Sequence, residues 1–421
     1  MRRIHANQID TGRLQVSTTT NGRARPVPDA KISIFQANTD GNQIQLEELR
    51  TDISGQTIEI ELPTPPLDYS LLPGSPMPYA QYDITIQANG YDTLAVRDIQ
   101  VLPSTLALQD CQLSFAGLTT QQAPQETVTI DHHTLYYEYP EKLPEDPIKP
   151  LPPPTGFVVL DRVVVPETIV VHAGPPDSPA ANYYVPFRDY IKNVASSEIY
   201  ANWPDASIKA NILAILSFTL NRVFTEWYRN KGKDFTITSS TAFDQAYFHG
   251  RNVFAEISRA VDEIFTTYIT KPDIRQPLFS QYCDGVRVKR DGWLSQWGSK
   301  DMADRGLPYL DILRSYYGST VYLDNAEKVA GIPKSYPGTP LRLGSTGDAV
   351  RTIQTQLNAI ANNFPAINKQ AADGVFGQAT DTAVKKFQQI FNLTQDGVVG
   401  SATWYKISEI YVGVAKMAVG V

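Results

Sequence analysis

Residues 206–230 read ASIKANILAILSFTLNRVFTEWYRN, a stretch that is apolar almost all the way round a helix through its middle. A helix on the surface of a globular protein keeps a polar face, so a helix that is apolar on every side belongs in a core. The stretch therefore predicts a buried central helix. The largest folded unit should surround it, and we expect that unit to span residues 156–328, with β-rich sequence first and helices after it.

An acidic residue lies just before this helix, in a segment that is otherwise mostly apolar. In PFRDYIKNVASSEIYANW (186–203), Phe187, Ile191, Val194 and Glu198 follow one another at spacings of 4, 3 and 4. These spacings place all four side chains on one helical face. No basic residue lies within five positions of Glu198. Desolvation without a paired cation would raise the pKa of its carboxyl, as a general acid requires. The alternative is a surface residue at a fraying helix end.

Composition bounds the function. The chain has 421 residues, enough for about three domains, and its net charge of −7 gives no basic surface for nucleic acid. No run approaches the 18 apolar residues of a membrane span. The arginines at the start are not followed by an apolar stretch, so no secretory signal is expected. The sequence predicts a multidomain α+β protein that partners neither nucleic acid nor membrane.

Residues 1–116 are predicted to form an N-terminal antiparallel β-sandwich. GRLQVSTTT, AKISIF and YDITIQANGYDTLAV alternate apolar and polar residues, and Asn-Gly and Ser-Gly pairs supply turns between them. The pattern resembles prealbumin-like modules, on the strength of its PVPDAKISI strand and TDISG turn.

Residues 117–155 are predicted to be a connector. Seven prolines fall within 140–154, a density that excludes helix and central strand and favours an extended, semi-rigid chain. The connector is also the expected site of proteolysis. His132 and His133 within it are expected to be exposed to solvent.

After a linker at 329–340, residues 341–421 are predicted to form a compact helical module. Val350, Ile353, Leu357 and Ile360 make a stripe, and ADGVFGQAT (372–380) is nearly repeated as QDGVVGSAT (395–403). Each copy is a glycine turn that leads into a helix. Together these segments resemble the peptidoglycan-binding module of bacterial wall hydrolases, a three-helix fold. The resemblance implies a cell-wall ligand.

Three blocks of the central unit resemble the SpoIID family of sporulation wall enzymes: ASSEIYANWP (195–204), FDQAYFHG (243–250) and GWLSQWGSKDMADRGLPYLDILRSYYG (292–318). The resemblance implies a mixed α/β domain that cleaves peptidoglycan glycan strands as a lytic transglycosylase. In such enzymes one glutamate serves as acid and base, while the muramic 6-hydroxyl attacks C1. Glu198 would have that role here. Substrate-binding roles fall to Trp203, Asp244, Gln245, Tyr247, Ser295 and Gln296.

Several of these positions have plainer alternatives. Asp244 could be a helper carboxylate, a helix N-cap or a loop anchor, and the Ser295–Gln296 pair could be only part of a turn. The family's Gly-His-Gly before Ser-Gln is Lys-Arg-Asp here, at 289–291. Some relatives bind zinc, but Cys283 and His249 are the only plausible ligands left, so no metal and no other cofactor is expected.

The order of the units resembles that of the clostridial spore cortex-lytic enzymes. That resemblance implies a zymogen stored in the bacterial spore and activated by a subtilisin-like Csp protease. The cut is expected between Gly117 and Pro140. Two alternatives remain open: a non-catalytic structural protein that binds the spore wall, and an enhancer of a separate amidase.

Overall fold

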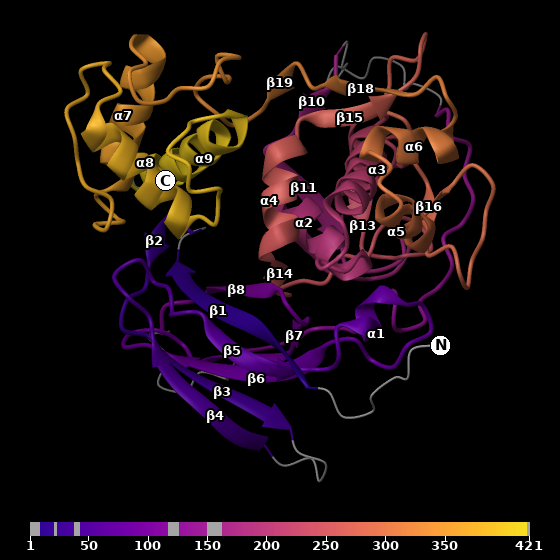
Figure 1. Cartoon of the computed structure of the whole chain (residues 1–421), viewed down its shortest axis with the longest axis horizontal. Helices are drawn as coiled ribbons and strands as arrows, with labels where there is room; N and C mark the ends of the chain where they lie inside the picture. Colours follow the sequence, from indigo (N-terminus) through magenta and orange to yellow (C-terminus); the bar gives the residue numbers. More distant parts are fainter. Residues whose placement is uncertain (1–8, 21–22, 38–42, 117–125, 150–161, 419–421) are drawn as a thin grey trace.

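The computed structural model describes residues 9–20, 23–37, 43–116, 126–149 and 162–418, with side chains to residue 415. Figure 1 shows three groups of elements: strands from the first third of the chain, a central body of helices and short strands, and the three helices of the tail. The fold is a mixture of α and β in several parts, as the sequence predicts.

The N-terminal unit contains two sheets. One has the order β14-β8-β1-β2 with β5 also on β1, and the other has the order β4-β3-β6-β7-β9. Alternate residues of β1 are buried, which is the pattern expected of a strand with one face on a core. The strands are β1 (Asp10–Thr20), β2 (Arg25–Pro26), β3 (Lys31–Ala37), β4 (Gln43–Arg50), β5 (Ile60–Thr64), β6 (Ala80–Gln87), β7 (Leu94–Val101), β8 (Leu106–Gln112) and β9 (Glu126–Thr129).

The expectation of purely antiparallel sheets is wrong in two places. β1 runs parallel to β8, and β7 runs parallel to β9. Alternating hydrophobicity predicts a strand with one buried face but not the direction of its neighbour. The sheets are also not confined to the first unit, because β14 (Val253–Phe254) of the central unit pairs with β8 and β9 lies in the expected connector.

The central helix α3 (Asp205–Phe224) is buried at sixteen of its twenty residues. It contacts α2 (Phe187–Glu198), α4 (Ala255–Ile264), α5 (Gln296–Asp304), α6 (Tyr309–Tyr317) and β15 (Thr267–Thr270). Figure 1 shows α3 inside this group, so the apolar stretch at 206–230 is the core of the central unit as predicted. The remaining short elements are β10 (Val164–Val165), β11 (Thr168–His172), β12 (Asn182–Pro186), η1 (Arg229–Lys231), β13 (Ile237–Thr238), β16 (Tyr282–Cys283), β17 (Leu294–Ser295), β18 (Tyr322–Asn325) and β19 (Lys328–Val329).

The tail consists of α7 (Asp348–Ile360), α8 (Gln378–Ile390) and α9 (Ser401–Ala418). Its two repeated turns are held in the same way. Gln354 accepts from the amide of Gly374 at 2.8 Å and donates to Thr380 at 3.1 Å. Gln388 makes the equivalent bonds to Gly397 at 2.9 Å and Thr403 at 3.3 Å. Each repeat is therefore closed by a glutamine from the preceding helix, which explains the sequence duplication.

The three units are packed against one another. Ala24, just before β2, is 1% exposed and belongs to the hydrophobic core of the tail. Its carbonyl accepts from Asn363 at 2.9 Å, and Arg188 of α2 donates to the carbonyl of Tyr405 at 3.3 Å. No helix in the described part of the chain is both long and apolar enough to cross a membrane.

The described connector residues, 126–149, lie against the other units. His133 is 1% exposed, so the expectation that it faces solvent is wrong. Its backbone N–H donates to the hydroxyl of Tyr79 at 3.2 Å, and its ring bonds the carbonyl of Ile199 at 3.2 Å. A proline-rich composition excludes regular structure but does not prevent such packing. Residues 117–125 and 150–155 lie outside the described ranges.

Candidate active site

Glu198 is the last residue of α2 and is only 4% exposed. Phe187, Ile191 and Val194 are buried with it, as are all the other residues of α2 except Asp189. Oε1 of Glu198 accepts from the backbone N–H of Ala246 at 2.8 Å. Within the described residues Oε2 makes no hydrogen bond of ordinary geometry, although the Tyr282 hydroxyl lies near enough to the carboxyl to influence its pKa. The carboxyl is thus fixed by one oxygen and has the other available for a proton.

Burial raises the pKa of Glu198. The Lys142 ammonium, the Ala246 amide and the Tyr282 hydroxyl oppose this rise without cancelling it. The structure therefore differs from the expectation of a carboxyl without a nearby cation, because the connector supplies Lys142. A buried carboxyl with a raised pKa keeps its proton to a higher pH than an ordinary glutamate, which suits a general acid.

Glu198 lines a cavity of about 310 Å³. Gln296 and Tyr282 line it as well, because parallel pairing of β16 with β17 places Tyr282 beside Leu294 and Cys283 beside Ser295. Ser295 is the N-cap of α5, and its hydroxyl accepts from the N–H of Gly298 at 2.9 Å. Gln296 therefore shares the cavity with the candidate acid, whereas the Ser295 side chain caps a helix.

One wall of this cavity comes from the connector. Its members all lie within residues 134–142 and are Thr134, Glu138, Tyr139, Pro140, Glu141 and Lys142. The Lys142 ammonium donates to the carbonyl of Asp244 and lies 4.5 Å from the ring centre of Tyr282 and 4.7 Å from that of Phe218. Burial lowers the pKa of Lys142, while Glu198 opposes that shift. A connector lysine therefore lies in the electrostatic field of the candidate acid.

Asp244 and Gln245 are fully buried and already bonded. Asp244 accepts from Arg222 at 2.7 Å, from the Tyr228 hydroxyl at 2.7 Å, and from Thr238 through its hydroxyl at 2.7 Å and its N–H at 2.9 Å. Such a set of donors is typical of a structural anchor, one of the alternatives for Asp244.

The side chain of Gln245 is likewise occupied within the core. It accepts from the hydroxyls of Tyr190 at 2.9 Å and Thr219 at 2.8 Å, and it donates to the carbonyl of Ile215 at 3.2 Å. Gln245 therefore ties α2 to α3.

Tyr247 and Trp203 lie outside the lining of the Glu198 cavity. The Tyr247 hydroxyl bonds Nδ1 of His249 at 3.0 Å, and its ring stacks on Tyr190 with ring centres 5.6 Å apart. The Trp203 indole N–H donates at 2.9 Å to the carbonyl of Ser70, in the short helix α1 (Asp68–Leu71) of the N-terminal unit. Trp203 therefore joins two units.

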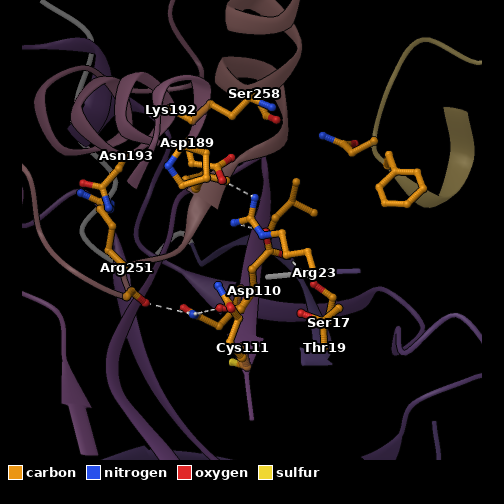
Figure 2. Close-up of a pocket in the computed structure, with 18 of the residues that line it drawn as sticks. Ser17, Thr19, Arg23, Asp110, Cys111, Asp189, Lys192, Asn193, Arg251 and Ser258 are labelled. Carbon is orange, nitrogen blue, oxygen red and sulfur yellow. Dashed lines mark hydrogen bonds and ion pairs between the residues drawn. The ribbon is translucent and has the colours of Figure 1, made fainter. Parts of the chain in front are cut away.

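Tyr247 lines a second cavity, of about 500 Å³, where the three units meet. Figure 2 shows Arg23 of the N-terminal unit between Asp110 of β8 and Asp189 of α2. Arg23 pairs with Asp110 at 2.9 Å and with Asp189 at 2.7 Å. The pair with Asp189 joins the N-terminal unit to the central unit, and the pair with Asp110 holds Arg23 in position within the N-terminal unit.

The two residues that could be remnants of a zinc site lie apart. Cys283 lines the Glu198 cavity and His249 lines the second cavity. The described residues contain no group of three or more His, Cys, Asp and Glu that could hold a metal ion. The residues present do not fit the zinc site of some SpoIID relatives.

Comparison with known families agrees with this arrangement. Residues 180–270, which contain α2, Glu198 and Asp244, match the model of the stage II sporulation protein family, SpoIID. Residues 346–407 match the model of a peptidoglycan binding domain. The two matches support a sporulation-related protein that acts on the cell wall and has peptidoglycan as a partner.

Individual relatives cover less of the chain. The zinc D-Ala-D-Ala carboxypeptidase of Streptomyces albus G is 40% identical over 77 residues, 18% of this chain and 28% of that protein. An uncharacterized protein in the bpoA1 3' region of Kitasatospora aureofaciens is 43% identical over 63 residues, 15% of this chain and 49% of that protein. The chain thus spans less than half the length of either curated relative.

Among solved structures, transthyretin from Sparus aurata matches 26% of this chain and 93% of its own, with 17% identity and a TM-score of 0.18. A TM-score of that size supports no conclusion. The prealbumin-like character of the N-terminal unit stays a prediction.

The sequence did not single out Lys142 or Tyr282. Lys142 lies in a proline-rich segment with no periodic pattern, and Tyr282 belongs to a two-residue strand. Only the folded chain brings them to Glu198.

Proposed function

We propose that the chain is the precursor of a spore cortex-lytic enzyme, comparable to the clostridial enzyme SleC, and that it cleaves peptidoglycan glycan strands as a lytic transglycosylase. The observation that carries the proposal is the environment of the Glu198 carboxyl. The group is buried, its pKa is raised, one of its oxygens accepts a hydrogen bond from Ala246, and the side chain lines a cavity. It lies within the part of the chain that matches SpoIID.

In the proposed reaction the protonated Glu198 gives its proton to the leaving glycosidic oxygen. The resulting carboxylate then takes the proton of the muramic 6-hydroxyl as that oxygen attacks C1. A 1,6-anhydro ring forms, and Glu198 is protonated again. One carboxyl is enough for this cycle, whereas glycosidases that use water need two. Gln296 lines the same cavity, and in this proposal it binds a sugar hydroxyl or acetamido group.

The test is the product of cleavage. Cortex peptidoglycan incubated with connector-cleaved protein should yield anhydro-muramic ends by mass spectrometry, and Glu198→Gln should abolish them. Glu256→Gln is the matched control, because burial also raises the pKa of Glu256 and it lies within the SpoIID match but does not line the cavity. Reducing ends would instead indicate hydrolysis. No cleavage at all would favour a wall-binding structural protein or an amidase enhancer.

We also propose that the intact chain is inactive because residues 134–142 cover the cavity, and that the attachment of the preceding His132 and His133 to the N-terminal unit helps to keep them there. The support is the Lys142 ammonium near Glu198 and the bonds of His132 and His133, just before this segment, to the hydroxyl of Tyr79. A subtilisin-like Csp protease would be the activating partner in the spore. Limited proteolysis in the connector should raise cleavage activity, and equal rates before and after proteolysis would exclude a zymogen.

A further inference from the structure

The loop after β16 is built around one carboxylate. Asp284 accepts from the backbone N–H groups of Val286 at 3.1 Å and Val288 at 2.9 Å. It also accepts from Nε of Arg287 at 2.6 Å. Because the same carboxylate fixes the turn and binds Nε of the guanidinium, Arg287 is held in one orientation before any ligand binds.

The two outer nitrogens of Arg287 point to the connector. Nη1 donates to the carbonyl of Tyr137 at 2.8 Å, and Nη2 donates to the carbonyl of Thr134 at 2.6 Å. Both acceptors belong to the segment that covers the cavity, and Arg287 lines the same cavity as Glu198. Two outer N–H groups of a fixed guanidinium match the two oxygens of a carboxylate, which bind more strongly than neutral carbonyls.

We propose that Arg287 is a substrate-binding residue that holds a carboxylate of the glycan strand beside Glu198. In the precursor, two backbone carbonyls of the connector bind Arg287 where that carboxylate would bind. This proposal rests on the proposed function. Muramic acid supplies the chemistry, because its lactyl group either ends in a free carboxylate or is joined by an amide to a stem peptide that carries carboxylates of its own. Arg287 would therefore select a muramic acid rather than a glucosamine for the sugar at this position.

The neighbouring cation provides a contrast. Arg290 contacts Glu141 at 3.4 Å through side chains that are 45% and 60% exposed, and it does not line the cavity. Such a surface pair contributes little and fixes no orientation. Arg290→Ala removes the same charge from the same loop, so it separates a specific carboxylate contact from a general electrostatic attraction.

The test measures binding rather than cleavage. The connector-cleaved chain carrying Glu198→Gln is titrated by calorimetry with three soluble disaccharides of N-acetylglucosamine and N-acetylmuramic acid. The first has a free lactyl carboxylate, the second has that group amidated, and the third carries a tetrapeptide on it. The Glu198→Gln background makes the result independent of catalysis, so a failed cleavage assay and a failed binding assay are distinguishable.

We expect Arg287→Ala to weaken binding of the first or the third probe about tenfold, as for a lost hydrogen-bonded charge pair. The amidated probe should bind weakly and equally with and without Arg287. A loss confined to the third probe would place the carboxylate on the stem peptide. Arg290→Ala should leave all three affinities unchanged, and Arg287→Lys should restore part of the loss while confirming that the loop still folds.

Three results would overturn the proposal. The first is unchanged affinity of Arg287→Ala for both carboxylate probes. The second is an equal loss for the amidated probe, which would show a structural effect. The third is an absence of binding to all probes by the cleaved chain with Arg287 intact.

Discussion

Replacing Asp244 by asparagine should destabilise the central unit strongly. The Asp244 side chain is fully buried, and its Oδ2 accepts three of its hydrogen bonds while Oδ1 accepts from Arg222. An asparagine must turn its NH₂ group toward one of these sets of donors, so bonds are replaced by donor–donor contacts. Breaking a buried ion pair costs about 3–5 kcal/mol. Arg222 keeps Glu145, at 2.5 Å, so we expect a loss of about 3 kcal/mol, near the lower limit.

The assay is urea unfolding of the full chain followed by tryptophan fluorescence. Asp177→Asn is the matched control, because Asp177 pairs with Lys233 through a side chain that is 91% exposed, and this variant should unfold like the parent. At temperatures where Asp244→Asn is folded, its KM for peptidoglycan should equal that of the parent protein. A loss below about 1 kcal/mol, or a raised KM with unchanged stability, would refute the anchor role and favour sugar binding.

Two further predictions concern the site and the tail. Tyr282→Phe removes a hydroxyl that lowers the pKa of Glu198, so the alkaline limb of the kcat/KM profile, where the acid loses its proton, should move to higher pH in the connector-cleaved chain. Tyr317→Phe is the control, because that hydroxyl bonds the carbonyl of Gln281 at 2.9 Å, and an unmoved or lowered limb in Tyr282→Phe would contradict the assignment. Trp404→Ala should destabilise the tail by about 3–5 kcal/mol and weaken its retention on peptidoglycan, because Trp404 is 2% exposed in the tail core. Calorimetric unfolding measures the stability, and co-sedimentation with sacculi measures the retention. An unchanged unfolding transition would refute the prediction.

The sequence predicts the helices of this protein better than the contacts between its units. The spacing of Phe187, Ile191, Val194 and Glu198 predicts a shared helical face because helical periodicity is local. It does not predict that α2 is buried at eleven of its twelve residues, polar ones included, which depends on the units around it. The strand pairing of β9 with β7 depends on residues about thirty positions apart in the chain, and no pattern within either strand encodes it. The same limit explains why Lys142 could not be assigned to the cavity.

The site residues divide in the same way. The motif blocks single out Glu198 and Gln296, and the structure shows that both line one cavity. The blocks do not distinguish a residue that faces a ligand from one that supports the fold. Asp244 and Gln245 belong to the same motif block as Tyr247, yet their polar atoms are hydrogen-bonded to partners in the core. Only a count of hydrogen-bond partners separates the two roles, and that count needs a fold.

The shared strands bear on how fast activation could proceed. For a cut before Glu126, the chain is severed, yet β9 still lies on β7 and β14 still lies on β8. Scission and separation are then two events with different rates: the first is set by the protease, and the second by spontaneous dissociation of a nicked complex. An interval between nicking and full activity would be a built-in delay, whose length depends on the strength of the contacts between the units, the shared strands and the Arg23–Asp189 ion pair among them, rather than on the amount of protease.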